Sequence, residues 1–174
     1  MPRSAGVDAE FAEFVAARSG QLYRSAYLLT TSSHAAEDLL QTALAKSYVG
    51  WRRVRHADDP VAYVHGVLIK SFLSERRRRS STELPVADAP EPAGTWTDPT
   101  ERVALMAALS QLAPLDRAVV VLRFWEDRSV AQTATDLDLS EAAVKNRSLR
   151  ALRTLRELLA ETDTSPSTPT RSAT

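Results

Sequence analysis

The sequence predicts an all-α protein, with two small helical domains joined by a flexible linker. Three observations support this prediction. Apolar residues recur at spacings of three and four in both halves, as they do on one face of a helix. No segment shows the apolar–polar alternation of a half-buried strand. The stretch 80–99 contains four Pro and one Gly, a composition that interrupts helices and is typical of linkers.

Residues 1–79 form the first predicted domain. Its first helix covers residues 8–30, where large apolar side chains recur at helical spacing. Ser33 is expected to cap a second helix, which continues toward Trp51. Asp59-Pro60 is expected to open a third helix, because proline suits the first helical turn.

Residues 100–161 form the second predicted domain, and residues 162–174 are expected to be a disordered tail. Asp98-Pro99 and Pro114 open its first two helices. Two further helices follow, capped by Ser129 and Ser140 and separated by the turn "DLDLS". Two helices joined by a short turn predict a helix-turn-helix.

Composition limits the possible functions. The chain has 174 residues, 22 basic and 22 acidic residues, and no Cys, so disulfides and thiolate metal sites are excluded. Its three His show no metal-ligand spacing, and no catalytic constellation is visible. We therefore expect no metal and no cofactor. Without an apolar run of about 18 residues or a secretory signal pattern, a cytoplasmic location is the simplest expectation.

Positive charge is concentrated on the last helix. From Lys145 to Arg156 there are five basic residues and no acidic one. At 100° per residue, the face expected to pack on the core holds Val144, Ser148, Ala151, Leu152, Leu155 and Leu159. The opposite face holds Ala142, Ala143, Asn146, Arg150 and Arg153, flanked by Lys145, Arg147 and Arg156.

This outward face suits the major groove of DNA. Small Ala side chains permit close approach, Asn can bond adenine, and Arg can bond guanine. The flanking basic residues can hold phosphates. The alternative is a solvated basic face on an ordinary helical bundle.

Two segments together resemble the extracytoplasmic-function sigma factors of the sigma-70 family. "RAVVVLRFWEDRSVAQTATDLDLSEAAVKNRSLRALRTLREL" resembles their C-terminal domain, and "LYRSAYLLTTSSHAAEDLLQTALAKSY" resembles their polymerase-binding segment. The resemblance covers about 11–160. It implies a bacterial initiation factor, without enzymatic activity of its own, that binds the clamp and flap of core RNA polymerase. It also implies contacts with promoter DNA at the −10 and −35 elements. It also implies an anti-sigma factor as a partner. The preference for Arg over Lys indicates a GC-rich genome.

The resemblance assigns roles to individual residues. The segment that docks on polymerase corresponds to Glu37, Asp38, Leu39, Leu40 and Gln41. The −10 surface corresponds to Arg52, Arg53, His65, Lys70, Arg76 and Arg77. The −35 surface corresponds to Ala143, Lys145, Asn146, Leu149 and Arg150, to which the helix geometry adds Arg147 and Arg153.

Simpler interpretations stay open for several of these residues. Glu37 and Asp38 would also offset the helix dipole, and the arginines at 76–79 would suit a solvated helix end. Tyr63 and Phe72 are expected to pack in the core. Trp51 is expected to anchor the fold, with the neighbouring arginines facing DNA.

The sequence also departs from the family pattern. Lys70 stands where Asn is common, which leaves the −10 base preference open. Thr133 replaces an acidic residue, and Ala143 replaces a Thr. Asp138 replaces the turn Gly and Ser148 replaces an apolar residue. These last two changes together are expected to weaken the C-terminal domain by about 1–2 kcal/mol.

The linker must connect two domains that bind separate promoter elements. Twenty residues reach at most about 66–72 Å when extended, but average about 22–27 Å as a flexible coil. We therefore expect a compact free protein, whose two domains core polymerase would hold apart.

Two other functions are compatible with the helical pattern. One is a stand-alone helix-turn-helix regulator, and the other is an interaction protein that does not bind DNA.

Overall fold

The computed structural model describes residues 5–79 and 98–164, and within these ranges every regular element is helical. The elements are α1 (Ala5–Thr30), α2 (Ser33–Val49), α3 (Trp51–Val54), α4 (Pro60–Arg79), α5 (Pro99–Gln111), α6 (Pro114–Val120), η1 (Val121–Trp125), α7 (Val130–Leu137) and α8 (Glu141–Thr164). The all-α prediction is confirmed. Most of the predicted linker and the predicted tail lie outside the described residues.

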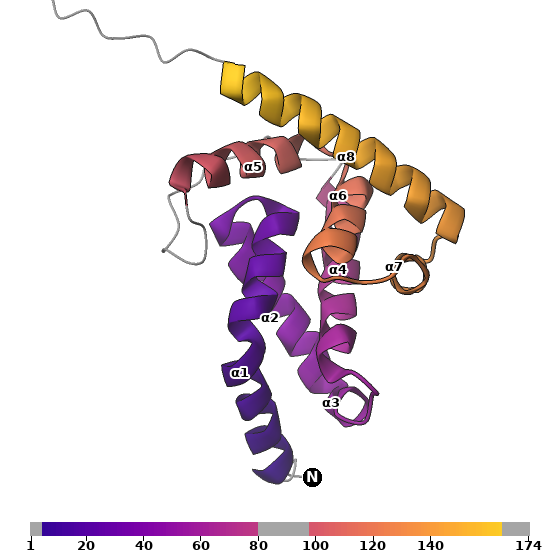
Figure 1. Ribbon diagram of the computed structural model, residues 1–174. Coiled ribbons are helices and arrows are strands. Elements are labelled where there is room, and N and C mark those ends of the chain that lie inside the picture. Colours follow the sequence, from indigo (N-terminus) through magenta and orange to yellow (C-terminus); the bar gives the residue numbers. More distant parts are fainter. Residues whose placement is uncertain (1–4, 80–97, 165–174) are drawn as a thin grey trace, which may run out of the picture.

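The N-terminal half is a bundle of α1, α2 and α4 (Figure 1). Its interior is filled by large apolar side chains that are almost completely buried, among them Leu22, Leu29, Leu39, Leu68 and Phe72. They lie three, four or seven residues apart along each helix, as an amphipathic pattern requires. Phe72 therefore packs in the core as expected. Tyr63, by contrast, is 36% exposed, so the core position expected for it is wrong.

Most helix starts lie where the capping residues predicted them. Asp98 accepts a hydrogen bond from the Thr100 N–H at 2.8 Å. The predicted cap of α2 is wrong by one residue, because Ser32 accepts from Ala35 N–H at 3.2 Å. Thr31, just before it, has a φ of 57°. This left-handed residue turns the chain sharply between α1 and α2.

Trp51 anchors the short helix α3. Its ring lies 5.1 Å from the ring of Phe11 and 5.2 Å from that of Phe14, measured between centroids. It is only 4% exposed, which confirms its predicted anchoring role. Because aromatic clusters fix both position and orientation, α3 holds Arg52 and Arg53 on the surface, where both are exposed.

In the C-terminal half, α7 and α8 form the predicted helix-turn-helix. Asp138 ends α7 with φ 54° and ψ 48°, the left-handed conformation that favours Gly. Asp tolerates this region better than most residues do. Beyond the turn, Val144 of α8 packs with Val119 and Ala134. The replacement of the usual Gly therefore leaves the helix-turn-helix geometry intact.

Two buried hydroxyls in this half differ in their hydrogen bonding. Ser148 donates to the carbonyl of Val144 at 2.8 Å, so its polar group is satisfied within α8. Thr133 is fully buried, and its Oγ1 has no partner among the described residues. The cost expected at Ser148 is therefore offset, and the unsatisfied group is at Thr133.

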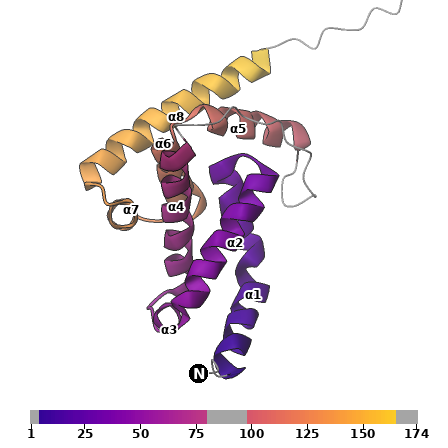
Figure 2. The same cartoon turned by 180° about the vertical axis from the view of Figure 1, so that it is seen from behind.

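The two halves pack against each other, as expected for a compact free form. Buried residues of α1, α2 and α4 belong to the same core cluster as those of α5, α6 and α8. In both views, α5 and α8 cross one end of the N-terminal bundle (Figures 1 and 2). This arrangement places α6 beside α4.

Arg117 of α6 lies at the centre of this junction. Its guanidinium donates to the carbonyl of Leu29 at 2.6 Å, to that of Leu112 at 3.1 Å and to that of Ser110 at 3.2 Å. These carbonyls lie at the ends of α1 and α5, where helical partners are missing. Burial, together with the charge of Arg76, lowers the pKa of Arg117 to about 10, so the group remains protonated at neutral pH.

A second polar contact joins the halves just after η1. Glu126 accepts a hydrogen bond from the Ser25 hydroxyl of α1. Its other carboxylate oxygen lies 2.9 Å from Nδ1 of His65 in α4. The His65 and Glu126 side chains are only 4% and 8% exposed. One carboxylate therefore links the C-terminal half to two helices of the N-terminal bundle.

We predict that Thr133→Val will raise the stability of the protein. Valine keeps the shape of the side chain and removes a buried hydroxyl that lacks a partner, which should gain about 1 kcal/mol. Thermal denaturation of the full chain measures this. Ser148→Ala is the matched control, with an expected change within about 0.5 kcal/mol. A lower melting temperature for Thr133→Val would show that the hydroxyl is satisfied in solution.

We predict that Arg117→Met will destabilise the folded chain by about 2–4 kcal/mol, because buried carbonyls of α1 and α5 lose a charged donor. Urea denaturation followed by circular dichroism measures the change. Arg102→Met, at a half-exposed position of α5, is the control and should stay within about 0.5 kcal/mol. A loss at Arg117 no larger than that of the control would contradict the packing of the two halves.

Candidate nucleic-acid interface

The last helix presents two distinct faces. Val144, Ser148, Ala151 and Leu155 are buried, and Leu152 and Leu159 are half-buried. On the opposite side Ala142, Asn146, Arg150 and Arg153 are exposed, and Ala143 is half-buried. Leu149, which is 66% exposed, adds an apolar surface beside them. The predicted division of this helix is therefore confirmed.

The start of α8 is held by the turn and by α7. Ser140 caps the helix by accepting from the Ala143 N–H at 3.1 Å. The N–H of Leu139 donates to the carbonyl of Ala134 at 2.9 Å. The first turns of α8 are thus fixed to α7, while Ala142 and Asn146 face the solvent. This is the placement that a recognition helix needs to bring its N-terminal residues to base edges.

The polar side chains of this face differ in their pairing. Asn146 and Lys145 are exposed and have no hydrogen-bond partner among the described residues. Arg147 and Arg150 both reach Asp116 of α6, at shortest distances of 2.6 Å and 2.8 Å. Asp116 was not identified from the sequence, because no local pattern shows which helix a single acid will meet.

The basic residues of α4 line a groove against the C-terminal half. The groove measures about 650 Å³. Lys70, Arg76 and Arg77 contribute to one wall, and Asp136 and Asp138 contribute to the other. In this closed arrangement, part of the predicted −10 surface faces carboxylates that have the same sign of charge as DNA. Arg52 and Arg53 lie apart from the groove and are exposed.

His65 lies inside the junction, and its side chain is 4% exposed. It contacts Glu126 and does not reach the surface. DNA could meet His65 only after the two halves separate. Tyr63, two residues earlier on α4, is accessible in the closed form and offers an aromatic surface for an unpaired base.

The predicted polymerase-binding segment forms the first turns of α2. Glu37, Asp38 and Gln41 are exposed, and Leu40 is half-buried. Leu39 is 1% exposed and packs in the core. It therefore supports the segment from beneath, and the polar side chains form its accessible surface.

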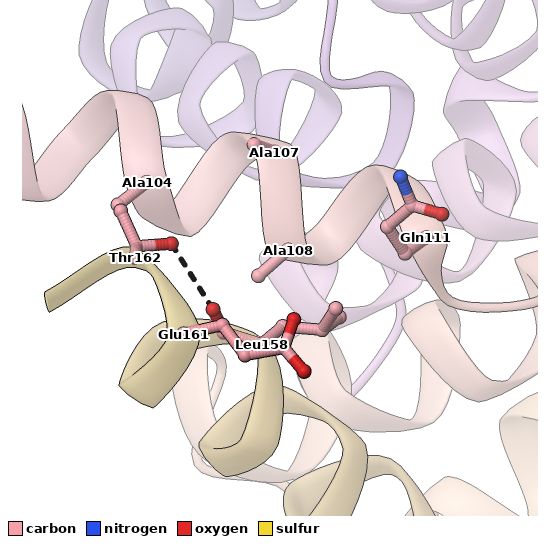
Figure 3. A pocket seen from close by; sticks show the side chains of 7 residues that line it. All are labelled: Ala104, Ala107, Ala108, Gln111, Leu158, Glu161 and Thr162. Carbon is pink, nitrogen blue, oxygen red and sulfur yellow. Dashed lines mark hydrogen bonds between the residues drawn. The ribbon is translucent and has the colours of Figure 1, made fainter. Parts of the chain in front are cut away.

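Within residues 5–79 and 98–164, no group of His, Cys, Asp and Glu could hold a metal ion. A hollow of about 340 Å³ lies between α5 and α8 (Figure 3). It is lined by Ala104, Ala107, Ala108, Gln111, Leu158, Glu161 and Thr162. The Thr162 hydroxyl donates to the carbonyl of Leu158 at 3.0 Å. None of the helices in the described residues is both long and apolar enough to cross a membrane.

Both halves match known families. The family described as sigma-70 region 2 matches residues 14–82, and the family described as sigma-70, region 4 matches residues 102–155. The two matches follow the order that the sequence predicted. They decide against a stand-alone helix-turn-helix regulator and against an interaction protein that does not bind DNA.

Several curated proteins are similar over most of the chain. The RNA polymerase sigma-E factor of Streptomyces coelicolor is 40% identical over 158 residues, which cover 88% of each chain. The ECF RNA polymerase sigma factor SigM of Mycobacterium tuberculosis is 30% identical over 140 residues, covering 80% of this chain and 71% of the relative. These sources agree with the GC-rich genome expected from the sequence.

A solved structure shares the fold. The sigma factor RpoE from Bartonella quintana, in complex with the anti-sigma factor NepR, aligns with a TM-score of 0.73 and 23% identity, covering 87% of this chain and 97% of that one. The alignment therefore extends over both helical halves. The region 2 and region 4 matches, together with these relatives, show that the chain belongs to the sigma-70 family, as an alternative RNA polymerase sigma factor of the ECF subfamily.

Proposed function

We propose that this sigma factor recognises promoters through two surfaces on separate domains. Residues 1–79 would bind core polymerase and contact the −10 region, and residues 100–161 would read the −35 element. Residues 80–99 would connect the two domains. A tail at 162–174 would follow the second domain, although residues 162–164 still belong to α8. The observation that carries the proposal is the outward face of α8, which exposes Asn146 beside basic side chains at the start of a helix fixed by a tight turn.

The −35 surface combines two kinds of contact. Asn146 and Arg150 would contact base edges, because amide and guanidinium groups match adenine and guanine in the major groove. Leu149 and Ala143 would supply apolar contact, for example to a thymine methyl group. The flanking side chains Lys145, Arg147 and Arg153 would contact phosphates and fix the register.

The −10 surface would become available when the halves separate. Opening would remove Asp136 and Asp138 from the groove in front of Lys70, Arg76 and Arg77. It would also expose His65. A basic track beside an accessible aromatic ring suits single-stranded DNA. Arg52 and Arg53, held by the Trp51 anchor, would extend this track.

Core polymerase would bind the first turns of α2 through its clamp, by Glu37, Asp38, Leu40 and Gln41, with Leu39 supporting them. The flap of the polymerase would contact the C-terminal domain. Because polymerase and chromosome are cytoplasmic in bacteria, the site of action would be the cytoplasm. The chain would act by binding and would need no catalytic group of its own.

An anti-sigma factor is a further proposed partner. The support for it is the fold shared with RpoE, whose structure contains the anti-sigma factor NepR. Such a partner would cover surfaces needed for polymerase or DNA.

The proposal predicts distinct defects for two sets of variants in run-off transcription with purified core polymerase. Asn146→Ala and Arg150→Ala should each reduce initiation about 5- to 100-fold at a promoter with a −35 element, because one base contact contributes about 1–3 kcal/mol. Arg18→Ala, an exposed arginine of α1, is the control and should initiate normally.

The double variant Glu37→Ala with Asp38→Ala should be defective in polymerase binding, a step that precedes the promoter recognition affected by the α8 variants. It should bind core polymerase more weakly in a pull-down without DNA, while Asn146→Ala and Arg150→Ala bind it normally. Normal initiation by both α8 variants would refute −35 reading by α8. Normal polymerase binding by the α2 double variant would refute the role of α2.

A further inference from the structure

Asp116 of α6 lies beneath the DNA-facing surface of α8 and binds two of its arginines. It accepts one hydrogen bond from Nη1 of Arg147 at 2.6 Å. From Arg150 it accepts bonds donated by Nε at 3.3 Å and by Nη2 at 2.8 Å and 2.9 Å. The carboxylate is 34 residues away from Arg150 in the chain, so the pairing exists only in the folded domain.

We infer that Asp116 is a positioning residue that orients the guanidinium of Arg150 for reading guanine in the −35 element. This inference rests on the proposed −35 role of α8 and identifies how one of its contacts is prepared. It assigns to α6, which does not itself carry the predicted recognition residues, a part in base specificity.

The pairing geometry leaves the reading edge of Arg150 open. The carboxylate engages the side of the guanidinium that carries Nε and Nη2. Nη1 of Arg150 has no partner in the part of the chain that the structure describes. The outer edge, formed by Nη1 and the second hydrogen of Nη2, can therefore donate two bonds to O6 and N7 of guanine.

The exposed fractions of Asp116 and Arg150 show that the carboxylate is held in place and that the guanidinium is accessible. Asp116 has 6% of its surface exposed, and it lies in a short helix packed against α8. The Arg150 side chain is 61% exposed. A fixed carboxylate holding the inner side of an exposed guanidinium reduces the rotamer freedom that Arg150 must lose when it binds a base.

The charge of Asp116 does not oppose DNA binding, because two arginines share it. Arg147, whose side chain is 30% exposed, covers the other side of the carboxylate. The cluster of Asp116, Arg147 and Arg150 therefore carries a net charge of about +1. A buried acid compensated in this way can restrain Arg150 without repelling phosphates.

Asp116 could also serve only to hold α6 against α8, and base preference separates the two roles. A lost structural link would weaken binding to all −35 sequences alike. A lost positioning contact would reduce preference at the one base pair that Arg150 reads. The readout must therefore resolve each position of the −35 element.

The experiment uses the full chain with core polymerase and a promoter library randomised across the −35 element, with start-site transcripts sequenced. Arg150→Ala should remove a guanine preference at one position. Asp116→Ala should reduce the preference at that same position about tenfold, with preferences at the other −35 positions and at −10 unchanged. Asp116→Asn, which keeps the size and one acceptor oxygen, should lose less than Asp116→Ala.

Asp136→Ala is the matched control, because Asp136 also pairs with an arginine of this half, Arg128 at 3.1 Å, and forms no ion pair with an arginine of α8 in the described residues. It should keep the wild-type preference. Thermal denaturation shows whether each variant is folded. If Asp116→Ala is not folded, Asp116→Asn takes its place in the comparison of base preferences. A full guanine preference in folded Asp116→Ala, or a uniform loss at all positions, would overturn the inference while leaving −35 reading intact. If Arg150→Ala changed no preference, the proposed −35 role of Arg150 would itself be wrong.

Discussion

The fold depends on how the carbonyl groups at two helix ends are satisfied where the two halves meet. The last carbonyls of a helix have no partner within it, and buried ones need a donor. Arg117 supplies that donor to the ends of α1 and α5. The shared core places α6 beside α4, and Glu126 contacts Ser25 and His65 at the same junction. Arg117, Glu126 and the shared core thus hold together the surfaces that the two halves cover.

This packing affects the two DNA surfaces differently. The outward face of α8 is exposed in the closed form, while the groove between α4 and α6–α7 places acids before the basic residues of α4. Opening must break the bond from Arg117 to Leu29 and the contacts of Glu126 with Ser25 and His65, and these groups would then be hydrated. Polymerase binding would have to supply that free energy. A closed chain therefore favours polymerase-dependent recognition of −10 DNA over recognition by the free protein.

The sequence predicted features that depend on neighbouring residues and missed those that depend on distant ones. Helical spacing identified both faces of α8, and capping residues identified most helix starts, although α2 is capped by Ser32 and not by the predicted Ser33. Periodicity shows that a face is buried, but it does not show what covers it. The contacts of Asp116 with Arg150 and of Glu126 with His65 join residues far apart in the chain, so no local pattern indicated them.

The most direct test of this account is the distance between the two halves. The chain has no Cys, so Glu13→Cys in α1 and Val103→Cys in α5, both at exposed positions, can carry a pair of spin labels. The free protein should give one narrow distance distribution by pulsed electron resonance. With core polymerase and promoter DNA the distance should increase by on the order of 20 Å or more, within the reach of the connecting residues. An unchanged distance in that complex would contradict the account.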